Sequence, residues 1–96
     1  MSQIIFSKRS KIELQKLSKY LEREFSEKVK NNFLDEFEKT VEIIKSNPNT
    51  FPKSDRNKYH KAVITKQTSI FYRFDVRIIN VVSVFDTRQN PNKIKK

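Results

Sequence analysis

Apolar residues recur at steps of three and four along two consecutive stretches in the first half of the chain. The two sets are, in order, Leu14, Leu17, Leu21 and Phe25, then Val29, Phe33, Phe37, Val41 and Ile44. This spacing places each set on one face of an amphipathic helix. Ser26-Glu27 marks the break between the helices, and the second ends near Ser46 because the residue before Pro48 is disfavoured in the α conformation. The short link predicts an antiparallel helical hairpin.

A short apolar run at residues 3–6 precedes the first helix, and we interpret it as a strand. Ser10 and Glu13 follow with the spacing of a capping box. In that motif a Ser side chain accepts from an early helical N–H and the Glu reaches back. The sequence therefore predicts that Ser10 caps the start of the first helix.

The periodicity changes in the second half, where β-branched and aromatic residues gather in three runs. The runs cover residues 62–65, 70–74 and 78–85, and their composition favours strands. Residues 66–68 and 75–77 are the expected connections of an antiparallel meander. Phe51, in the polar loop before the meander, is expected to pack on the core. The whole chain predicts an α+β fold with the order strand, helix, helix and three strands.

Alternation along the strands assigns side chains to two faces of the sheet. In the middle strand Ile70, Tyr72 and Phe74 share one face, and Phe71 and Arg73 share the other. In the last strand, strict alternation separates Ile78, Asn80, Val82 and Val84 from Ile79, Val81, Ser83 and Phe85. One face packs on the helices, with Tyr72 in the core. The other is partly apolar and partly basic, which is unusual for a face left to water, and we interpret it as a binding surface.

Charge is unevenly divided along this 96-residue chain, whose length fits a single domain over residues 1–96. Residues 1–52 hold ten Lys and Arg against eight Asp and Glu, whereas residues 53–96 hold eleven against three. The formal net charge of +10 therefore comes mainly from the sheet half, which ends in a basic tail at residues 93–96. Such a field attracts RNA, DNA or an acidic protein.

Residue types exclude several classes of function. The chain has no Cys, so disulfides, thiolate metal sites and a Cys nucleophile are excluded. No stretch approaches the roughly 20 apolar residues that span a bilayer, and the first residues do not resemble a signal peptide. We therefore expect a cytoplasmic protein without a membrane partner. Because His60, Asp55, Asp75 and Asp86 lack the spacing of metal ligands, we expect neither a metal nor another cofactor.

The order of elements, together with several local stretches, resembles the RelE/ParE superfamily of toxins from bacterial type II toxin–antitoxin, or plasmid stabilisation, systems. The similarity covers nearly the whole chain, and its most typical stretches are Ile70-Phe71-Tyr72-Arg73-Phe74, residues 79–85 and Arg88-Gln89-Asn90-Pro91. It implies a cognate antitoxin that wraps across the sheet and helices in a hetero-oligomer. It also implies a target: mRNA in the ribosomal A site for RelE-like toxins, or DNA gyrase for ParE-like toxins.

The resemblance also points to residues for metal-free RNA cleavage, which needs a base, a cation at the phosphate and an acid. Arg88 falls close to the family's late Arg and is the candidate phosphate ligand. Lys61 is the candidate base, and His60 beside it is either a catalytic group or an exposed residue at the start of a strand. Two departures weaken this site. Thr68-Ser69 stands where the RNases carry an Arg, and residues 92–96 lack their terminal Tyr or His-Tyr pair.

Contacts to the target or the antitoxin are expected from the open face and rim of the sheet. Arg73 either forms a salt bridge to Asp86 or Asp75, or contacts a phosphate or an antitoxin carboxylate. The other candidates are two loop cations, two aromatic residues and one polar residue after the last strand, namely Arg56, Lys58, Phe71, Phe85 and Gln89.

Three functions are compatible with these features. The missing terminal Tyr favours an antitoxin-neutralised toxin that inhibits a protein target such as gyrase. The first alternative is a ribosome-dependent mRNA endonuclease that uses Lys61 and Arg88. The second is a non-toxic basic module that binds nucleic acid or protein. In that case Phe71 and Phe85 are possible platforms for stacked bases, although packing against the helices explains them equally well.

Overall fold

The computed structural model describes residues 3–54 and 58–88, which form strands and helices in the predicted order. The elements are β1 (Gln3–Phe6), α1 (Lys8–Glu24), α2 (Glu27–Ser46), the short 3-10 helix η1 (Pro48–Thr50), β2 (His60–Val63), β3 (Thr68–Phe74) and β4 (Ile78–Asp86). The α+β architecture is therefore confirmed. Strands β2 and β3 each begin two residues earlier than predicted.

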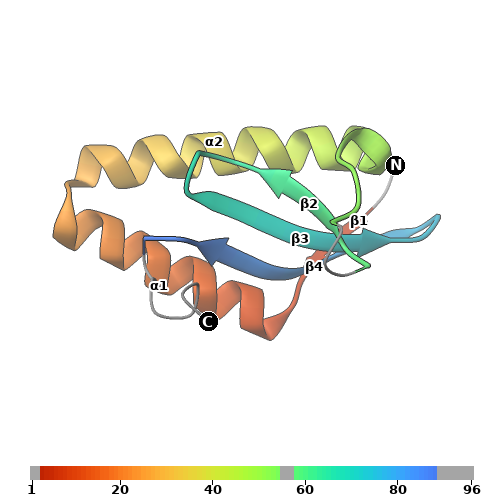
Figure 1. Ribbon diagram of the computed structural model, residues 1–96, viewed down its shortest axis with the longest axis horizontal. Helices are drawn as coiled ribbons and strands as arrows, with labels where there is room; N and C mark the ends of the chain where they lie inside the picture. Colours follow the sequence, from red (N-terminus) through yellow and green to blue (C-terminus); the bar gives the residue numbers. More distant parts are fainter. Residues whose placement is uncertain (1–2, 55–57, 89–96) are drawn as a thin grey trace.

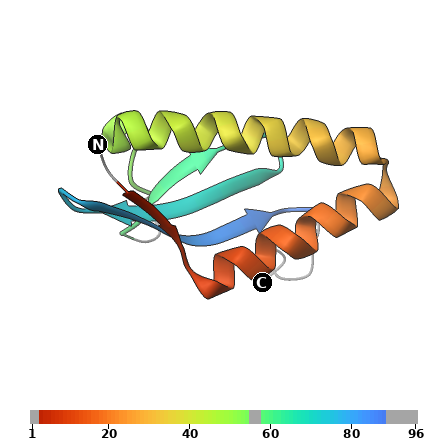
Figure 2. The ribbon, with the colours of Figure 1, turned by 180° about the vertical axis from the view of Figure 1, so that it is seen from behind.

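The four strands form one sheet in the order β1-β4-β3-β2. Strands β2, β3 and β4 are the predicted antiparallel meander, and β1 adds to its edge parallel to β4. Figure 1 shows α1 and α2 joined at one end of the molecule and diverging towards the other, with the sheet running along them. Figure 2 shows how β1 leads directly into α1. Neither helix is long and apolar enough to cross a membrane.

Both helices begin at a serine cap. Ser26 caps α2, as the predicted break requires, and its side chain accepts from the Val29 N–H at 3.1 Å. The cap of α1 is Ser7, not Ser10, so the predicted capping box is wrong. Ser7 is extended directly after β1, and its Oγ accepts from the Ser10 N–H at 3.0 Å. Ser10 is instead buried in the first turn, and its hydroxyl donates to the Ser7 carbonyl at 2.8 Å.

One face of the sheet packs on both helices. Buried apolar side chains from all of these elements form a single core: Leu17, Leu21, Phe33, Phe37, Val41, Ile44, Ala62, Ile64, Ile70, Tyr72, Ile79, Val81 and Val84. Tyr72 is fully buried as predicted, and its hydroxyl donates to the Pro48 carbonyl at 2.6 Å. Phe51 packs against the edge of this core, which confirms its expected position.

A β-bulge interrupts the alternation in β4. Phe71 pairs with Ser83, but the next residue, Tyr72, pairs with Val81, so Val82 has no partner in β3. An extra residue of this kind reverses the facing of every side chain beyond it. Val84 consequently joins Val81 in the core, and the strict alternation predicted for this strand is wrong from Ser83 onward.

Candidate functional site

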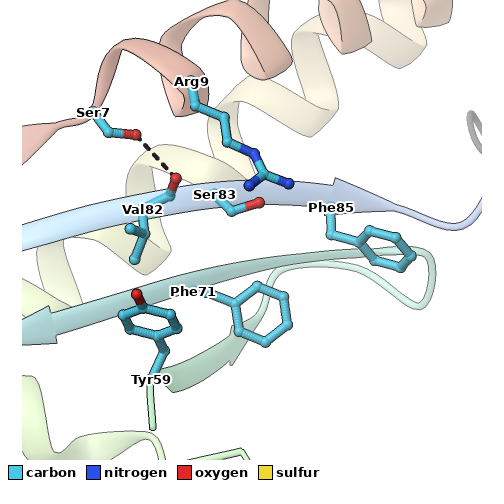
Figure 3. A pocket seen from close by; sticks show the side chains of 7 residues that line it. All are labelled: Ser7, Arg9, Tyr59, Phe71, Val82, Ser83 and Phe85. Carbon is cyan, nitrogen blue, oxygen red and sulfur yellow. Dashed lines mark hydrogen bonds between the residues drawn. The ribbon is translucent and has the colours of Figure 1, made fainter. Parts of the chain in front are cut away.

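A groove of about 410 Å³ lies on the face of the sheet that the helices leave uncovered. The start of α1, the loop before β2, and strands β3 and β4 contribute its lining: Ser7, Arg9, Tyr59, Phe71, Val82, Ser83 and Phe85. Figure 3 shows the rings of Phe71 and Tyr59 on one side of the groove and Arg9 reaching from α1 on the other. Aromatic and aliphatic side chains make its floor, and the guanidinium group of Arg9 lies at its rim.

Hydrogen bonds from the start of α1 hold the bulge that shapes this groove. The Ser7 N–H donates to the Val81 carbonyl at 2.9 Å, and the Ser7 hydroxyl donates to the Val82 carbonyl at 2.9 Å (Figure 3). One residue therefore caps the helix and binds the extra residue of β4. This arrangement exposes Val82 and Ser83 to the groove together.

Glu13 completes this connection from the second turn of α1. Its Oε1 atom accepts from the Ser83 hydroxyl at 3.1 Å and from the Val84 N–H at 2.9 Å. Its Oε2 atom accepts from Arg9 Nε at 3.1 Å. Glu13 thus does not reach back to the helix cap as the capping box predicted, because β4 supplies unpaired donors at the bulge.

Lys61 lies on the same face of the sheet as the groove. It is exposed on β2, directly across from Phe71, and its backbone N–H donates to the Pro52 carbonyl at 3.0 Å. Lys58 is also exposed, just before β2. The structure therefore places Lys61 beside Phe71, which lines the groove together with Phe85.

His60 faces the opposite side of the sheet. It is only 8% exposed, so the expectation of an exposed residue is wrong. Its Nδ1 atom lies 2.6 Å from the Phe51 carbonyl, and its ring stacks on Tyr72 with 5.2 Å between centroids. Adjacent residues of a strand point to opposite faces, and His60 is therefore not brought together with Lys61.

Arg88 lies beyond the end of β4 and is bound to Asp86. Its Nη2 atom is 3.0 Å from Asp86 Oδ2, and its guanidinium carbon lies 5.6 Å from the centre of the Phe25 ring. Asp86 is 2% exposed, and the Thr68 hydroxyl also donates to it. Burial raises the pKa of Asp86, but hydrogen bonds from Arg88 and Thr68 and the charge of Arg88 lower it by more, so its pKa lies below the usual value.

Arg73 forms neither of the salt bridges considered from the sequence. It is exposed on β3 opposite Asn80. Asp86 binds Arg88 instead, and Asp75 accepts from the backbone N–H groups of Arg77 and Ile78 in the hairpin turn. Those two hydrogen bonds hold the pKa of the exposed Asp75 below its usual value. Within residues 3–54 and 58–88, Arg73 is therefore a cation on the open face without a salt bridge.

The groove also contains residues that the sequence did not reveal as site residues. Ser7, Arg9, Val82 and Ser83 were not predicted there, because their positions depend on the helix cap and the bulge. The basic first turn of α1 could have marked Arg9 as a site residue, because cations are disfavoured at the N-terminal end of a helix. Two predicted residues, Arg56 and Gln89, lie outside the described residues, as does the basic tail.

These features define a class of small α+β domain, with a helical hairpin on one face of a sheet and a basic, partly apolar groove on the other. A family model for the ParE toxin of the type II toxin–antitoxin system parDE matches residues 4–91. The chain belongs to this ParE toxin family, and a toxin of this kind has an antitoxin partner. A search of curated proteins gives no match.

Two solved structures share the fold. One comes from the chromosomal ParDE system of P. aeruginosa, with a TM-score of 0.74 at 9% identity, covering 90% of this chain and 96% of that one. The other is the YoeB dimer of Staphylococcus aureus, with a TM-score of 0.59 at 16% identity, covering 88% of this chain and 94% of that one. Identities this low establish similarity of fold alone.

Proposed function

We propose that this toxin acts in the cytoplasm by binding and inhibiting a protein target such as DNA gyrase, and that it does not cleave RNA. The observation that carries the proposal is the separation of the three candidate catalytic residues. Lys61 lies on the open face, His60 is buried on the helix-facing side, and Arg88 is bound to Asp86 beyond the end of β4.

Metal-free RNA cleavage requires a base, an acid and a cation within hydrogen-bonding reach of one phosphodiester. In the described part of the chain, His60 and Lys61 cannot act on one phosphate because they are on opposite faces. Arg88 would first have to leave the buried carboxylate of Asp86, and breaking a buried ion pair costs free energy. An inhibitor that acts by binding needs only a complementary surface, and the groove with its flanking cations supports the proposal that such a surface lies on this face.

Two assays run side by side test the proposal. Purified protein is added to gyrase in a supercoiling assay and to ribosomes programmed with a defined mRNA. We expect inhibition of supercoiling and intact mRNA. Cleavage at codon positions, lost in Lys61→Ala and Arg88→Ala, would instead identify an endoribonuclease. Arg77→Ala removes a cation from the exposed β3–β4 turn and is the matched control for charge.

One observation favours the endoribonuclease as the second candidate. Lys61 is paired across the strands with Phe71, and Tyr59 and Phe85 line the same groove. Aromatic side chains beside cations are the features that bind single-stranded nucleic acid. The third candidate, a non-toxic basic module, is tested by expression alone, because a toxin arrests growth and co-expression of its antitoxin in a hetero-oligomer relieves the arrest.

A further inference from the structure

The cations of α1 gather on its solvent side. Buried Ser10, Leu17 and Leu21 mark the side of the helix that faces the core. Lys8 and Lys19 each lie two positions from one of these residues, and two positions turn an α-helix through about 200°. Both lysines therefore point away from the core. The exposed cations follow one another along the helix at steps of five residues or fewer, and we call this set the basic stripe: Lys8, Arg9, Lys11, Lys16, Lys19 and Arg23.

The acidic residues of α1 do not neutralise the lysines of the basic stripe. Each acid is already in another salt bridge, namely Glu13 with Arg9 at 3.1 Å, Glu22 with Lys30 of α2 at 3.5 Å, and Glu24 with Arg23 at 2.9 Å. Across residues 3–54 and 58–88, no lysine of the stripe has a salt bridge. Uncompensated positive charge therefore runs from Lys8 to Lys19, a rise of about 17 Å along the helix axis.

Helix α2 has the opposite character on its outer side. Asp35, Glu38 and Glu42 lie there beside Lys39. Lys39 and Lys45 each pair with a Glu one turn earlier, at 3.6 and 3.7 Å. Figure 1 shows α1 and α2 along opposite borders of the molecule. The near-neutral first half of the chain is therefore divided in space, and an anionic partner is attracted to α1 more than to α2.

The basic stripe matches the phosphate backbone of a duplex. Duplex DNA carries one negative charge per about 1.7 Å of its axis, so a row of lysines of this length lies beside about ten of them. No exposed residue of α1 is aromatic, and the stripe therefore offers no platform for the bases of a single strand. Ile12 is the single exposed apolar residue of α1, which is too little to insert into a lipid surface.

We propose that the basic stripe of α1 binds duplex DNA through its phosphate backbone, without reading its sequence. Lys16 and Lys19 are central contacts of this surface, which lies outside the groove except at Arg9. The choice of DNA rests on the proposed function, because gyrase acts on duplex DNA and a toxin that contacts the same duplex is concentrated at its target. The location of the surface on α1 does not depend on which target the toxin inhibits.

The test measures binding of the full-length protein to a fluorescent DNA duplex of about 20 base pairs by anisotropy, at salt concentrations from about 50 to 200 mM. Lys16→Gln/Lys19→Gln is compared with Lys39→Gln/Lys45→Gln, which removes the same charge from α2. Each lost phosphate contact lowers the slope of log K against log salt by about 0.9. We expect the α1 variant to lower the slope by about 1.8 and to weaken binding at least about tenfold. The α2 variant should keep the slope and weaken binding less than about threefold.

Further measurements separate a defined surface from general attraction. Surface lysines contribute little to stability, so the Tm of both variants should stay within about 4 °C of wild type. Equal weakening by the α1 and α2 variants would show attraction to net charge alone and overturn the proposal. Lys61→Gln/Arg73→Gln tests the open face of the sheet. The proposal is also overturned if DNA binding is lost in that variant and retained in Lys16→Gln/Lys19→Gln.

A duplex RNA of the same sequence distinguishes the other source of this backbone chemistry. Tighter binding of the RNA through Lys16 and Lys19 would reassign the stripe and overturn the choice of DNA. None of these measurements contains gyrase. A protein that binds DNA through α1 but leaves supercoiling unaffected refutes the proposed target and leaves this inference standing, whereas inhibition of supercoiling without DNA binding does the reverse.

Discussion

The guanidinium group of Arg88 contacts the carboxylate of Asp86 through two nitrogens, with Nη2 3.0 Å from Oδ2 and Nε 3.3 Å from Oδ1. The Arg88 backbone N–H adds a third bond to Oδ1 at 2.9 Å, and the Thr68 hydroxyl donates to Oδ2. The buried carboxylate thus joins the first residue of β3 to the chain just beyond β4. Arg88 has a structural explanation that requires no phosphate.

The first prediction concerns the loss of that cation. Arg88→Ala removes a charged hydrogen-bond donor from the buried Asp86 carboxylate, so we expect the free energy of unfolding to fall by about 1.5–3 kcal/mol. Urea denaturation measures this fall. Arg77→Ala removes the same charge from an exposed turn, and its effect should stay within about 0.5 kcal/mol. A stable Arg88→Ala protein that has lost its toxicity would instead assign Arg88 to the target.

The second prediction concerns acid. The pKa of Asp86 is lowered in the folded state, since hydrogen bonds and the charge of Arg88 outweigh its burial. A carboxyl with a depressed pKa contributes stability that is complete above its unfolded pKa, about 3.9, and is lost as pH falls through the folded pKa. Unfolding free energies measured from neutral pH down to about pH 2 should therefore show wild type losing more stability than Asp86→Asn. A constant difference between the two proteins across this range would contradict the assignment.

Regular periodicity was sufficient to predict most of the fold. The apolar stripes of α1 and α2, the break at Ser26 and the stop before Pro48 follow from residue types that act within one or two turns of a helix. The strands β2 to β4 also follow from a local signal, because β-branched and aromatic residues gather in three short runs. The parallel edge strand β1 depends on the path of the whole helical hairpin, and no local pattern encodes that pairing.

The candidate site was predicted less well, because it depends on one irregular residue. The bulge at Val82 places Val84 in the core and Ser83 beside the groove, whereas alternation placed them on the opposite faces. Side chains of Ser7 and Glu13, more than 65 residues away in sequence, satisfy the bulge. The exposure expected for His60 is wrong for a similar reason. The buried His60 ring contacts the carbonyl of Phe51 in the preceding loop, and no local pattern encodes that contact.

The third prediction concerns Glu13 as the residue that holds the bulge. Glu13→Ala leaves the Val84 N–H without its acceptor, and we expect a loss of about 1–3 kcal/mol. Hydrogen exchange of the Val84 amide should accelerate with it. Glu13→Gln retains an acceptor oxygen, so its free energy of unfolding should fall by less than that of Glu13→Ala. Glu24→Ala, which removes only an exposed partner of Arg23, is the control for charge on the same helix and should leave the exchange of Val84 unchanged.

The last prediction tests whether His60 is a structural residue of the core or a functional residue. Its ring is buried between Tyr72 and Phe74, at centroid distances of 5.2 and 5.0 Å, and its Nδ1 atom is bonded to the Phe51 carbonyl. His60→Ala should therefore lower the free energy of unfolding by roughly 2–4 kcal/mol through lost packing and an unpaired carbonyl. At temperatures where the variant remains folded, it should inhibit its target as wild type does. Lys61→Ala is the matched exposed neighbour, and its stability should change by less than about 0.5 kcal/mol. A His60→Ala protein as stable as wild type, but inactive towards its target, would show that the ring acts in function and that its burial is relieved when the target binds.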